Sequence, residues 1–448
     1  MRYRYRSYDE LKDSGVEWIG KIPKDWEVSK IKYILEKLIS GGTPDTNNEL
    51  FWGDKNINNI PWVSISDMSS VDYVDNTEKY ITLDGLQNKK LSIIKKGNLI
   101  YSIYATIGKV SELNIDATIN QALLGLECNN KINKTYLKYV LKSMERYVIS
   151  LSSSNTQNNL NAEKVKNMII PLSIEQEKIV NFLDKNISQF NLIISKKEKL
   201  IERLEESKKS LISEVATGKV KVVKTDDGYE LVKRSSEEMK DSGVEWLGEI
   251  PKDWDLKAIK YLFQLRNERN YKEMKDVQLL SLFTSLGVMK QGEVEARGNK
   301  VRTVEDYKEV YPNDIVVNII LAWMGAIGMS EHRGVISPAY DIYKPINNNI
   351  VSKYYHYLFR TPRFSGECYK KGRGIMDMRW RTYSDEFKSI IVTSPKVEEK
   401  NNIVKCLDEK INSIDNLIKS TQKQIEKLKE AKQSLISEAV TGKIEILD

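Results

Sequence analysis

The feature that most constrains this chain is an internal duplication. Residues 13–26 read DSGVEWIGKIPKDW and residues 241–254 read DSGVEWLGEIPKDW, so twelve of fourteen positions agree. Farther along, SLISEVATGKV at 210–220 returns as SLISEAVTGKI at 434–444. Self-similarity of this kind indicates two copies of one structural unit. Each half of the chain therefore holds a leading segment, a middle part and a tail.

The two middle parts agree far less than their flanks. NLIYSIYATIGKVSE at 98–112 resembles DIVVNIILAWMGAIGMSE at 314–331, whereas SGGTPDTNNELFWGD at 40–54 has no counterpart in the second half. Both middles contain short β-branched and aromatic runs broken by Gly, Asn and Asp, which favour strands. Matching flanks around divergent middles predict one scaffold that presents two different recognition lobes, each of mixed α/β (α+β) fold.

The tails predict two long helices. Residues 171–218 align without gaps with 395–442, and no Gly or Pro occurs in 179–216. Gly218 and Gly442 stand where C-terminal caps are expected. We expect an antiparallel pair within one chain, about 57 Å long, that separates the two lobes. The alternatives are that each helix packs on its own lobe, or that two chains pair through the same seam. The seam repeats in steps of three and four, as in a coiled coil, at Leu183, Ile187, Ile194, Ile201, Leu204 and Leu211, and at Leu407, Ile411, Ile418, Ile425, Leu428 and Leu435.

The two chain ends resemble the two sides of the segment that joins the halves. That segment, 219–240, begins like the C-terminal KIEILD and ends like the N-terminal residues. Such ends predict a circular arrangement with approximate two-fold symmetry. The chain then divides into a leading segment at 1–26, a first lobe at 27–174, a central helix at 175–218, a linker with the second leading segment at 219–254, a second lobe at 255–397 and a C-terminal helix at 398–448.

Composition sets broad limits on location and partners. The formal net charge of +7 and pI of about 8.8 permit a polyanionic partner without requiring one. The three cysteines, at 128, 368 and 406, are scattered, which favours reduced thiols in the cytoplasm. No apolar run approaches the roughly 18 residues that a membrane span needs, and the basic N-terminus lacks the apolar core of a secretory signal.

In the second lobe, residues 360–381 (RTPRFSGECYKKGRGIMDMRWR) carry seven basic side chains against two acidic ones. Arginines suit phosphate and guanine-edge contacts, and the glycines favour a loop that approaches a backbone closely. The segment is interleaved with Phe364, Tyr369 and Trp380. A solvated charged face is the simpler alternative. The DNA-contact candidates here are Lys370, Lys371, Arg373, Arg379 and Arg381, and weaker ones are Arg297, Arg302 and Arg333.

The first lobe has a thinner basic signal and more polar loops. Its basic candidates are Lys89, Lys90 and Lys109. The loop containing Gly42 and Thr43 and the TINQ run with Asn120 and Gln121 supply hydroxyl and amide groups, and an amide can pair with adenine in two hydrogen bonds. Asn120 and Gln121 equally fit the capping of a turn, which is the more common role for such residues.

The sequence contains no catalytic constellation that we recognise. It has neither a G-x-x-x-x-G-K-[ST] phosphate loop nor a G-x-G-x-x-G cofactor turn, and its carboxylates and cysteines form no metal-spaced cluster. Of the two histidines, His332 lies in a basic turn, and His356 lies in a helix-like YYHYLF run where a packed role is expected. We therefore predict a non-catalytic chain that holds no cofactor or metal of its own.

Several of these motifs, in this order and duplicated, resemble the specificity subunit of Type I restriction–modification systems. They are DSGVEWIGKIPKDW, the GGTP loop, TINQ, NTQNNL…IIPLSIEQEKIV and LISEVATGK, with DSGVEWLGEIPKDW, GVISPAYDIY and LISEAVTGK in the second half. The resemblance implies two target recognition domains, each recognising one half of a bipartite site in double-stranded DNA. It also implies that the helix pair fixes the spacing and docks partner subunits.

Those partners, by the same resemblance, are two methyltransferase subunits and restriction subunits that translocate and cleave DNA. S-adenosylmethionine, ATP and Mg²⁺ would be bound by the partners. Two other hypotheses stay open: a stand-alone DNA-binding regulator with two unlike lobes, and a coiled-coil scaffold that binds only proteins. A self-sufficient nuclease or methylase is disfavoured by the missing motifs.

Overall fold

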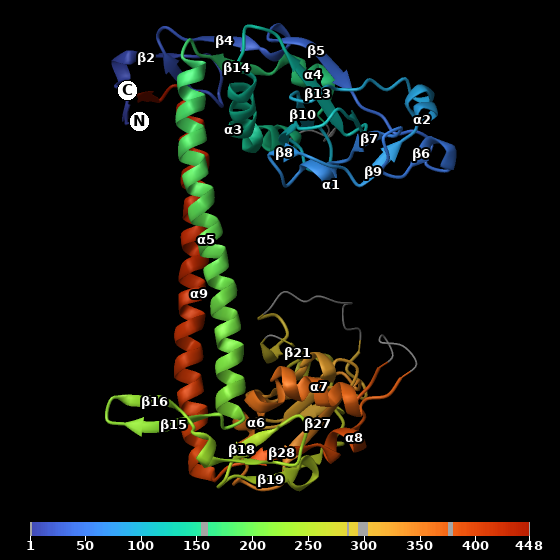
Figure 1. Ribbon diagram of the computed structural model, residues 1–448, viewed down its shortest axis with the longest axis vertical. Helices are drawn as coiled ribbons and strands as arrows, with labels where there is room; N and C mark the ends of the chain where they lie inside the picture. The colour runs from blue at the N-terminus through green and yellow to red at the C-terminus, as the bar shows by residue number, and fades with distance from the viewer. Residues whose placement is uncertain (1, 154–159, 285, 294–302, 375–379, 448) are drawn as a thin grey trace. The chain divides into compact units, whose positions relative to one another are not determined.

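The computed structural model describes residues 2–153, 160–284, 286–293, 303–374 and 380–447; at 151–153 it describes only the backbone. The chain divides into two compact units, one formed by 1–197 with 423–448 and the other by 198–422 (Figure 1). Each unit contains one lobe, one leading segment and part of each long helix. The duplication in the sequence is therefore a duplication of structural units.

The lobe of the first unit is built on two sheets. β-branched and aromatic residues pack well on a pleated surface, and all four side chains of β10 are buried. The larger sheet has the order β5 (Leu35–Ser40), β13 (Leu123–Cys128), β10 (Leu99–Ser102), β11 (Val110–Leu113), β8 (Tyr73–Val74). The smaller has the order β12 (Thr118–Ile119), β7 (Ile60–Val63), β9 (Lys79–Ile81), β6 (Trp52–Gly53). The helices are α1 (Ile65–Met68), α2 (Leu83–Asn88), α3 (Lys134–Ser153) and α4 (Ala162–Asn167).

The lobe of the second unit repeats the central part of that plan. Its main sheet has the order β20 (Phe263–Leu265), β27 (Tyr340–Pro345), β24 (Ile315–Asn318), β25 (Ile327–Met329). These strands correspond in chain order and pairing to β5, β13, β10 and β11, and all their pairings are antiparallel. Further elements are the pairs β21 (Leu280–Phe283) with β22 (Gly287–Lys290) and β23 (Lys308–Val310) with β26 (Gly334–Ile336), and the helices α6 (Ser352–Phe359), α7 (Pro362–Lys371) and α8 (Ser384–Ser389). The mixed α/β character predicted for both lobes is confirmed.

Each leading segment forms a short hairpin followed by a strand that joins the lobe. Trp18 donates from Nε1 to the Ile169 carbonyl at 3.1 Å, and Trp246 makes the same bond to Ile391, also at 3.1 Å. Both copies thus tie the hairpin to the strand that precedes a long helix. The strands are β2 (Leu11–Asp13) with β3 (Lys21–Pro23), β4 (Glu27–Lys30) with β14 (Ile169–Leu172), β17 (Met239–Asp241) with β18 (Glu249–Pro251), and β19 (Asp255–Ala258) with β28 (Ile391–Ser394).

The hairpins also cover the C-terminal ends of the long helices α5 (Gln176–Ala216) and α9 (Val397–Val440). Gly442 has φ +69°, its N–H donates to the Ala439 carbonyl, and the next N–H donates to Glu438 at 2.9 Å, which is a Schellman cap. A Cβ at Gly442 would fall 2.4 Å from Pro23 Cδ. Gly218 and Pro251 repeat this contact in the second unit. The repeated phrase, residues 13–26 and 241–254, therefore packs against the C-terminal ends of the long helices.

The chain ends meet within the first unit. β1 (Tyr3–Tyr5) pairs antiparallel with β29 (Ile444–Ile446), and Figure 1 marks the two termini next to each other. In the second unit the linker forms the hairpin β15 (Val220–Thr225) and β16 (Gly228–Lys233) with the corresponding register. The ladder at the termini is therefore an opened copy of the linker hairpin, as the predicted circular arrangement requires.

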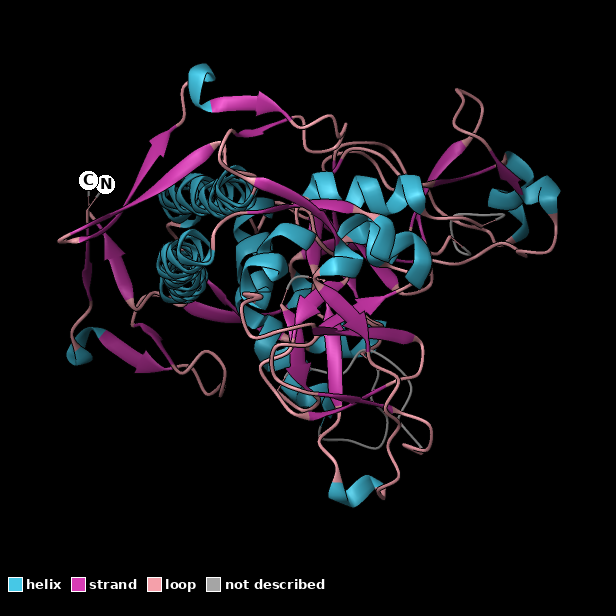
Figure 2. Ribbon diagram, turned by 90° about the horizontal axis from the view of Figure 1, so that it is seen from below, coloured by secondary structure: helices cyan, strands magenta, loops and turns pink. Residues whose placement is uncertain are grey.

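Helices α5 and α9 lie side by side (Figure 2) and run antiparallel, because the later residue of α5 pairs with the earlier residue of α9. In the first unit Lys197 Nζ donates to Gln424 at 2.6 Å, and in the second Lys208 Nζ meets Asp415 at 2.7 Å. All twelve seam residues named from the sequence are buried or half-buried. Surface ion pairs of this kind contribute little, so the apolar seam supplies most of the pairing energy.

Two tyrosines in each unit join the lobe to the helix pair. In the first unit Tyr136 and Tyr139 project from α3: Tyr136 donates to the Val440 carbonyl at 3.1 Å, and Tyr139 donates to Asp184. In the second unit Tyr354 of α6 donates to the Ala216 carbonyl at 2.9 Å, and its neighbour three residues on donates to a carboxylate of α9. Buried hydroxyls need such partners, and these bonds fix each lobe against its helix ends.

Candidate nucleic-acid interface

In the first lobe, three loops meet at one edge of the larger sheet. β5 and β10 end at this edge and β13 begins there, because β13 is antiparallel to both. The loops are 41–43, 103–109 and 120–122; the Gly41 N–H donates to Leu123 and the Ile103 N–H donates to Ala122. The GGTP and TINQ motifs, which lie far apart in the sequence, are therefore neighbours in the fold.

Glycine allows the first of these loops to approach so closely. A Cβ at Gly41 would fall 1.9 Å from the Asn120 carbonyl oxygen, and one at Gly42 would fall 2.9 Å from Leu91 Cδ2. The contact with Leu91 brings the preceding Lys89 and Lys90 beside the loop. Both lysines are exposed, and among the described residues neither is paired with a carboxylate. They add positive charge to this edge.

The two amides of TINQ behave differently. Asn120 is buried, and its Oδ1 accepts the Ala122 N–H at 3.1 Å, so it caps a turn. Gln121 is exposed, and its side-chain carbonyl accepts a hydrogen bond from Thr43. Gln121 and Thr43 thus present polar groups to solvent, whereas Asn120 shapes the backbone beneath them.

Lys109 is not free to contact a phosphate. Its Nζ lies 2.6 Å from Glu145 Oε1 of α3, and both side chains are about a third exposed. Its backbone N–H donates to Ser102 Oγ at 2.9 Å. The residue therefore closes the turn between β10 and β11 and links it to α3.

In the second lobe the prediction of a Gly-broken loop across 360–381 was wrong for its first half. Pro362–Lys371 is helix α7, capped by Thr361, whose Oγ1 accepts the Phe364 N–H. The sequence favours this helix because Pro suits its first turn and Thr suits the position before it. Phe364 is fully buried against Phe359 and Trp246 and cannot stack on a base.

After α7 the chain forms a basic surface. Arg373 and Arg381 exchange backbone hydrogen bonds at 3.0 and 3.1 Å, which sets the two residues opposite each other. Arg373 Nη2 lies 3.2 Å from Glu386, whereas the exposed Arg381 and Lys371 have no carboxylate partner among the described residues. Lys370 pairs with Glu245 of the leading segment, which raises the pKa of Lys370. Arg381 and Lys371 are the most available cations of this set.

Aromatic rings support this surface. Tyr369 stacks on Trp380 with ring centroids 5.0 Å apart, and Trp323 meets Tyr369 edge-on at 5.7 Å. Trp380 Nε1 donates to the Tyr369 carbonyl at 3.0 Å. The rings fix the backbone position of Arg381, which follows Trp380, because a stacked pair bonded to the backbone has few alternative arrangements.

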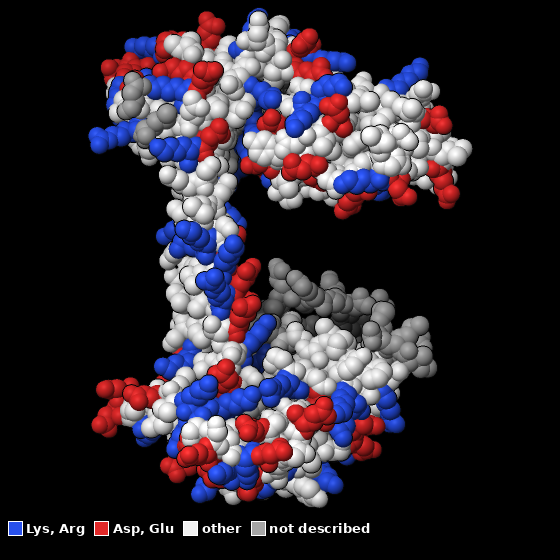
Figure 3. Space-filling model, in the orientation of Figure 1, with Lys and Arg blue, Asp and Glu red and all other residues white. Residues whose placement is uncertain are grey.

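The remaining basic candidates do not join this surface. Arg333 lies over the ring of Tyr311, and it follows the strand end that is opposite to the edge described above. Arg297, Arg302 and Arg379 lie outside the described residues. On the face drawn in Figure 3, Lys and Arg are interspersed with Asp and Glu over each unit, so charge alone does not delimit an interface.

Sequence reasoning missed the turns that stand between the predicted loops. In the first lobe this turn includes Tyr104, Ala105 and Thr106, all exposed, and in the second it includes the 3-10 helix η7 (Ala322–Met324). The signal was present, since 98–112 and 314–331 are similar stretches in the two middles. Their similarity reflects equivalent strands, and their difference lies in the turns.

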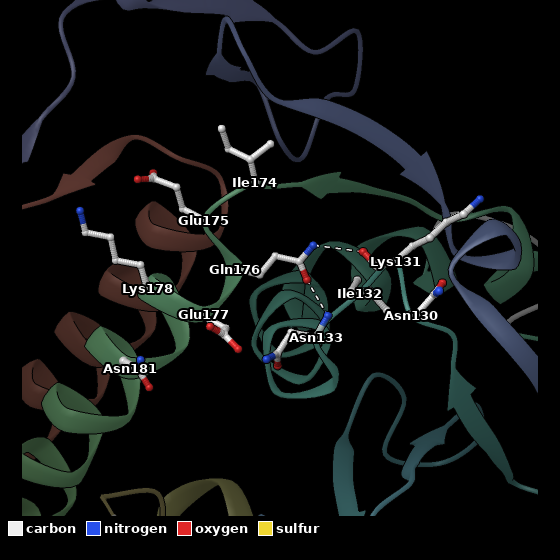
Figure 4. A pocket seen from close by; sticks show the side chains of 10 residues that line it. All are labelled: Asn130, Lys131, Ile132, Asn133, Ile174, Glu175, Gln176, Glu177, Lys178 and Asn181. Carbon is white, nitrogen blue, oxygen red and sulfur yellow. Dashed lines mark hydrogen bonds between the residues drawn. The ribbon is translucent and has the colours of Figure 1, made fainter.

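Other features of the first and second units serve structure. A hollow of about 730 Å³ lies beside the start of α5, where Gln176 accepts from the Asn133 N–H at 2.6 Å and donates to the Lys131 carbonyl at 3.2 Å (Figure 4). Burial lowers the pKa of His356 to about 3, and the neighbouring Arg360 adds to this, which fits a packed histidine. Within the described ranges, no cluster of His, Cys, Asp or Glu is arranged to hold a metal ion.

Comparisons with known proteins bear on this architecture. Residues 23–203 match the family model described as the Type I restriction modification DNA specificity domain. Over 99% of the chain and 98% of the relative, the sequence is 26% identical to the Type I restriction enzyme MjaIX specificity subunit of Methanocaldococcus jannaschii. The chain therefore contains a match to this specificity domain and is similar to a Type I specificity subunit over nearly its whole length.

Further comparisons give similar proteins. The Type I restriction enzyme EcoBI specificity subunit of Escherichia coli is 22% identical over 78% of this chain and 76% of its own. A chain from a structure of type I R-M complex assembly has a TM-score of 0.65 at 12% identity, and the match covers 94% of this chain and 98% of that one. The HsdS subunit of Thermoanaerobacter tengcongensis has a TM-score of 0.50 at 12% identity over 94% and 98%. These two structures support the fold. Among the residues that the structure describes, no helix is long and apolar enough to cross a membrane.

Proposed function

We propose that this chain recognises DNA sequence for a Type I restriction–modification complex and that each lobe recognises one half of a bipartite site. One observation carries the proposal. Corresponding sheet edges of the two duplicated lobes present different groups: the exposed Gln121 with the half-buried Thr43 in one, and the exposed Lys371 and Arg381 in the other. A shared frame with unlike exposed groups is what recognition of two unlike half-sites requires.

The chemistry of these groups suits double-stranded DNA. Exposed lysines and arginines would contact phosphates and give affinity that falls with salt, without sequence preference. Amide, hydroxyl and guanidinium groups at the same edges would contact base edges and supply the preference. Two weak half-site contacts on one chain reinforce each other, because binding of the first lobe raises the effective concentration of the second.

The long helices would set the distance between half-sites and dock the partner subunits. The helices and the leading segments are repeated in the two units, so two copies of one partner fit them better than two different partners. We propose two methyltransferase subunits, joined in the full complex by restriction subunits, all acting in the cytoplasm. S-adenosylmethionine, ATP and Mg²⁺ would reside on those partners, and this chain would contribute no catalytic group.

Base-modification mapping tests the proposal. DNA from cells that express this chain with its methyltransferase subunits should carry methylated bases in one bipartite motif. Replacing Arg381 by Ala should alter one half of that motif and leave the other half unchanged. A continuous motif, or no motif, would contradict the proposal.

A gel shift of the isolated chain separates the alternatives. Tight, specific binding without partners would favour a stand-alone regulator. A protein scaffold predicts no affinity for DNA that depends on salt.

A further inference from the structure

A turn occupies the same place in both lobes and exposes different side chains in each. In the first lobe it joins β10 to β11, and in the second it joins β24 to β25, the corresponding neighbours in the corresponding sheet. Each turn stands at the edge where the candidate DNA-contacting residues gather. In the first lobe the Ile103 N–H donates to the carbonyl of Ala122, which follows Gln121 in the chain. In the second lobe the N–H of Thr382, which follows Arg381, donates to the Ile319 carbonyl.

The turn of the first lobe exposes Tyr104, Ala105 and Thr106 and is held in an unusual backbone conformation. Ala105 has φ +58°, a left-handed value that a residue with a Cβ adopts only where its surroundings fix it. The base of the turn is held by Ser102, whose Oγ accepts the Lys109 N–H at 2.9 Å. Tyr104, next to the strained residue, is 38% exposed. The turn thus presents an aromatic hydroxyl on a fixed support.

The turn of the second lobe is apolar. Leu321 is 37% and Met324 is 55% exposed, although both belong to residue types that are usually buried. Between them Trp323 donates from Nε1 to the Ile320 carbonyl at 2.9 Å and packs edge-on against Tyr369. Gly325, with φ +82°, ends the short helix. Two exposed apolar side chains are therefore held in place beside a basic surface.

Apolar side chains next to cations have a specific counterpart in DNA. In the major groove thymine presents a C5 methyl group, which apolar side chains contact, while cations bind the flanking phosphates. A tyrosine hydroxyl can instead donate to or accept from a base edge. The difference between the two turns is therefore a difference in the base that each can recognise.

We propose that these two turns are specificity-determining elements: Leu321 and Met324 contact the methyl group of a thymine in one half-site, and the Tyr104 hydroxyl contacts a base edge in the other. This inference rests on the proposed function and makes it specific, since it assigns an A·T pair to the half-site of the second lobe.

The test uses the full chain in complex with its methyltransferase subunits and a duplex that carries the mapped bipartite site. Each thymidine is replaced in turn by 2′-deoxyuridine, which removes only the methyl group. Loss of one buried methyl group should weaken binding about four-fold at one position of one half-site. With Met324→Gln or Leu321→Gln the same replacement should weaken binding less at that position, because one of the two apolar contacts is already lost.

Matched controls separate a local effect from misfolding. Ile346 is 48% exposed and follows β27 at the opposite end of the sheet, so Ile346→Gln should keep the four-fold penalty. Tyr104→Phe removes only a hydroxyl and should reduce discrimination in the other half-site about three- to ten-fold. Tyr33→Ala, an exposed tyrosine that precedes β5, should not.

The outcomes are distinguishable. If the unaltered complex shows no bipartite site, the proposed function fails before this test begins. If a bipartite site exists and no deoxyuridine weakens binding, the assignment of the thymine contact is wrong, whatever the variants do. A penalty that persists undiminished in both Met324→Gln and Leu321→Gln overturns the assignment as well. Tyr104→Phe binding like the unaltered chain refutes the role of the first turn.

Discussion

Gly442→Ala should destabilise the first unit far more than the same change at Gly15. Both glycines have nearly equal backbone angles, φ +69° and +70°, so both substitutions place a Cβ in the left-handed region at a cost of about 1 kcal/mol. At Gly15 the new Cβ meets no atom within 4 Å. At Gly442 it falls 2.4 Å from Pro23 Cδ and 3.1 Å from Trp26 Cζ3.

Neither ring can move away easily. Pro23 and Trp26 are buried, and Trp26 is only 1% exposed. Overpacking at such sites costs about 1–3 kcal/mol, so the total for Gly442→Ala is about 2–4 kcal/mol. The difference from Gly15→Ala measures the contact between the repeated phrase and the helix end, because the backbone cost is common to both variants.

Urea unfolding followed by circular dichroism is the assay. We expect Gly442→Ala to lose about 2 kcal/mol more than Gly15→Ala in the free energy of unfolding. Gly218→Ala, where the Cβ would fall 2.6 Å from Pro251, should behave like Gly442→Ala. Equal losses at Gly15 and Gly442, within about 0.5 kcal/mol, would refute the view that the repeated phrase holds the helix ends.

Three further predictions follow from the described contacts. His356 has a pKa of about 3 when folded and about 6.5 when unfolded, so only the unfolded chain takes up the proton as pH falls below 6.5. The free energy of unfolding should therefore drop by about 2 kcal/mol from pH 7 to 5, and denaturant titrations should show a smaller drop for His356→Gln. Tyr136→Phe leaves the Val440 carbonyl at the end of α9 without this donor and should lower the free energy of unfolding by about 1–2 kcal/mol in the same titrations. Hydrogen exchange measured on the other unit should stay unchanged. A chain opened between Asp226 and Asp227 in the linker turn, with the paired termini joined by a two-residue turn, should keep its circular dichroism spectrum and methylation motif; loss of either would contradict the circular arrangement.

The repeat made most of the fold predictable. Two copies with the same register predicted equivalent helices and equivalent leading segments, and the paired termini follow from the same alignment. Trp26 and Trp254 occupy the same position in residues 13–26 and 241–254, and both are buried. These features were accessible because local pattern and internal similarity encode them directly.

The candidate site was predictable only in part. Asn120 follows the general preference of such residues for capping turns, and the structure shows that role. The pairing of Lys109 with Glu145, by contrast, depends on the packing of α3 beside β11, which no local pattern encodes. Phe364 was grouped with the basic segment because charged residues surround it in the sequence, whereas the structure buries it completely. Which face of α7 is buried follows from its packing.

The turns at 103–107 and 319–326 were hidden for another reason. Their flanking strands are similar in the two halves, so the stretch reads as scaffold. The turn residues differ between the two halves. Only the strand pairing, β10 with β11 and β24 with β25, shows that they lie at the same edge of the corresponding sheet.

Methylation mapping of a chain with longer helices tests the central claim most directly. One heptad inserted after Lys197 and one after Gln422, the points where the two units divide, lengthens each helix by about 10.5 Å without changing the seam. The account predicts that both half-sites stay the same while the spacer between them grows by up to about three base pairs, at 3.4 Å each. An unchanged spacer with retained methylation would contradict it.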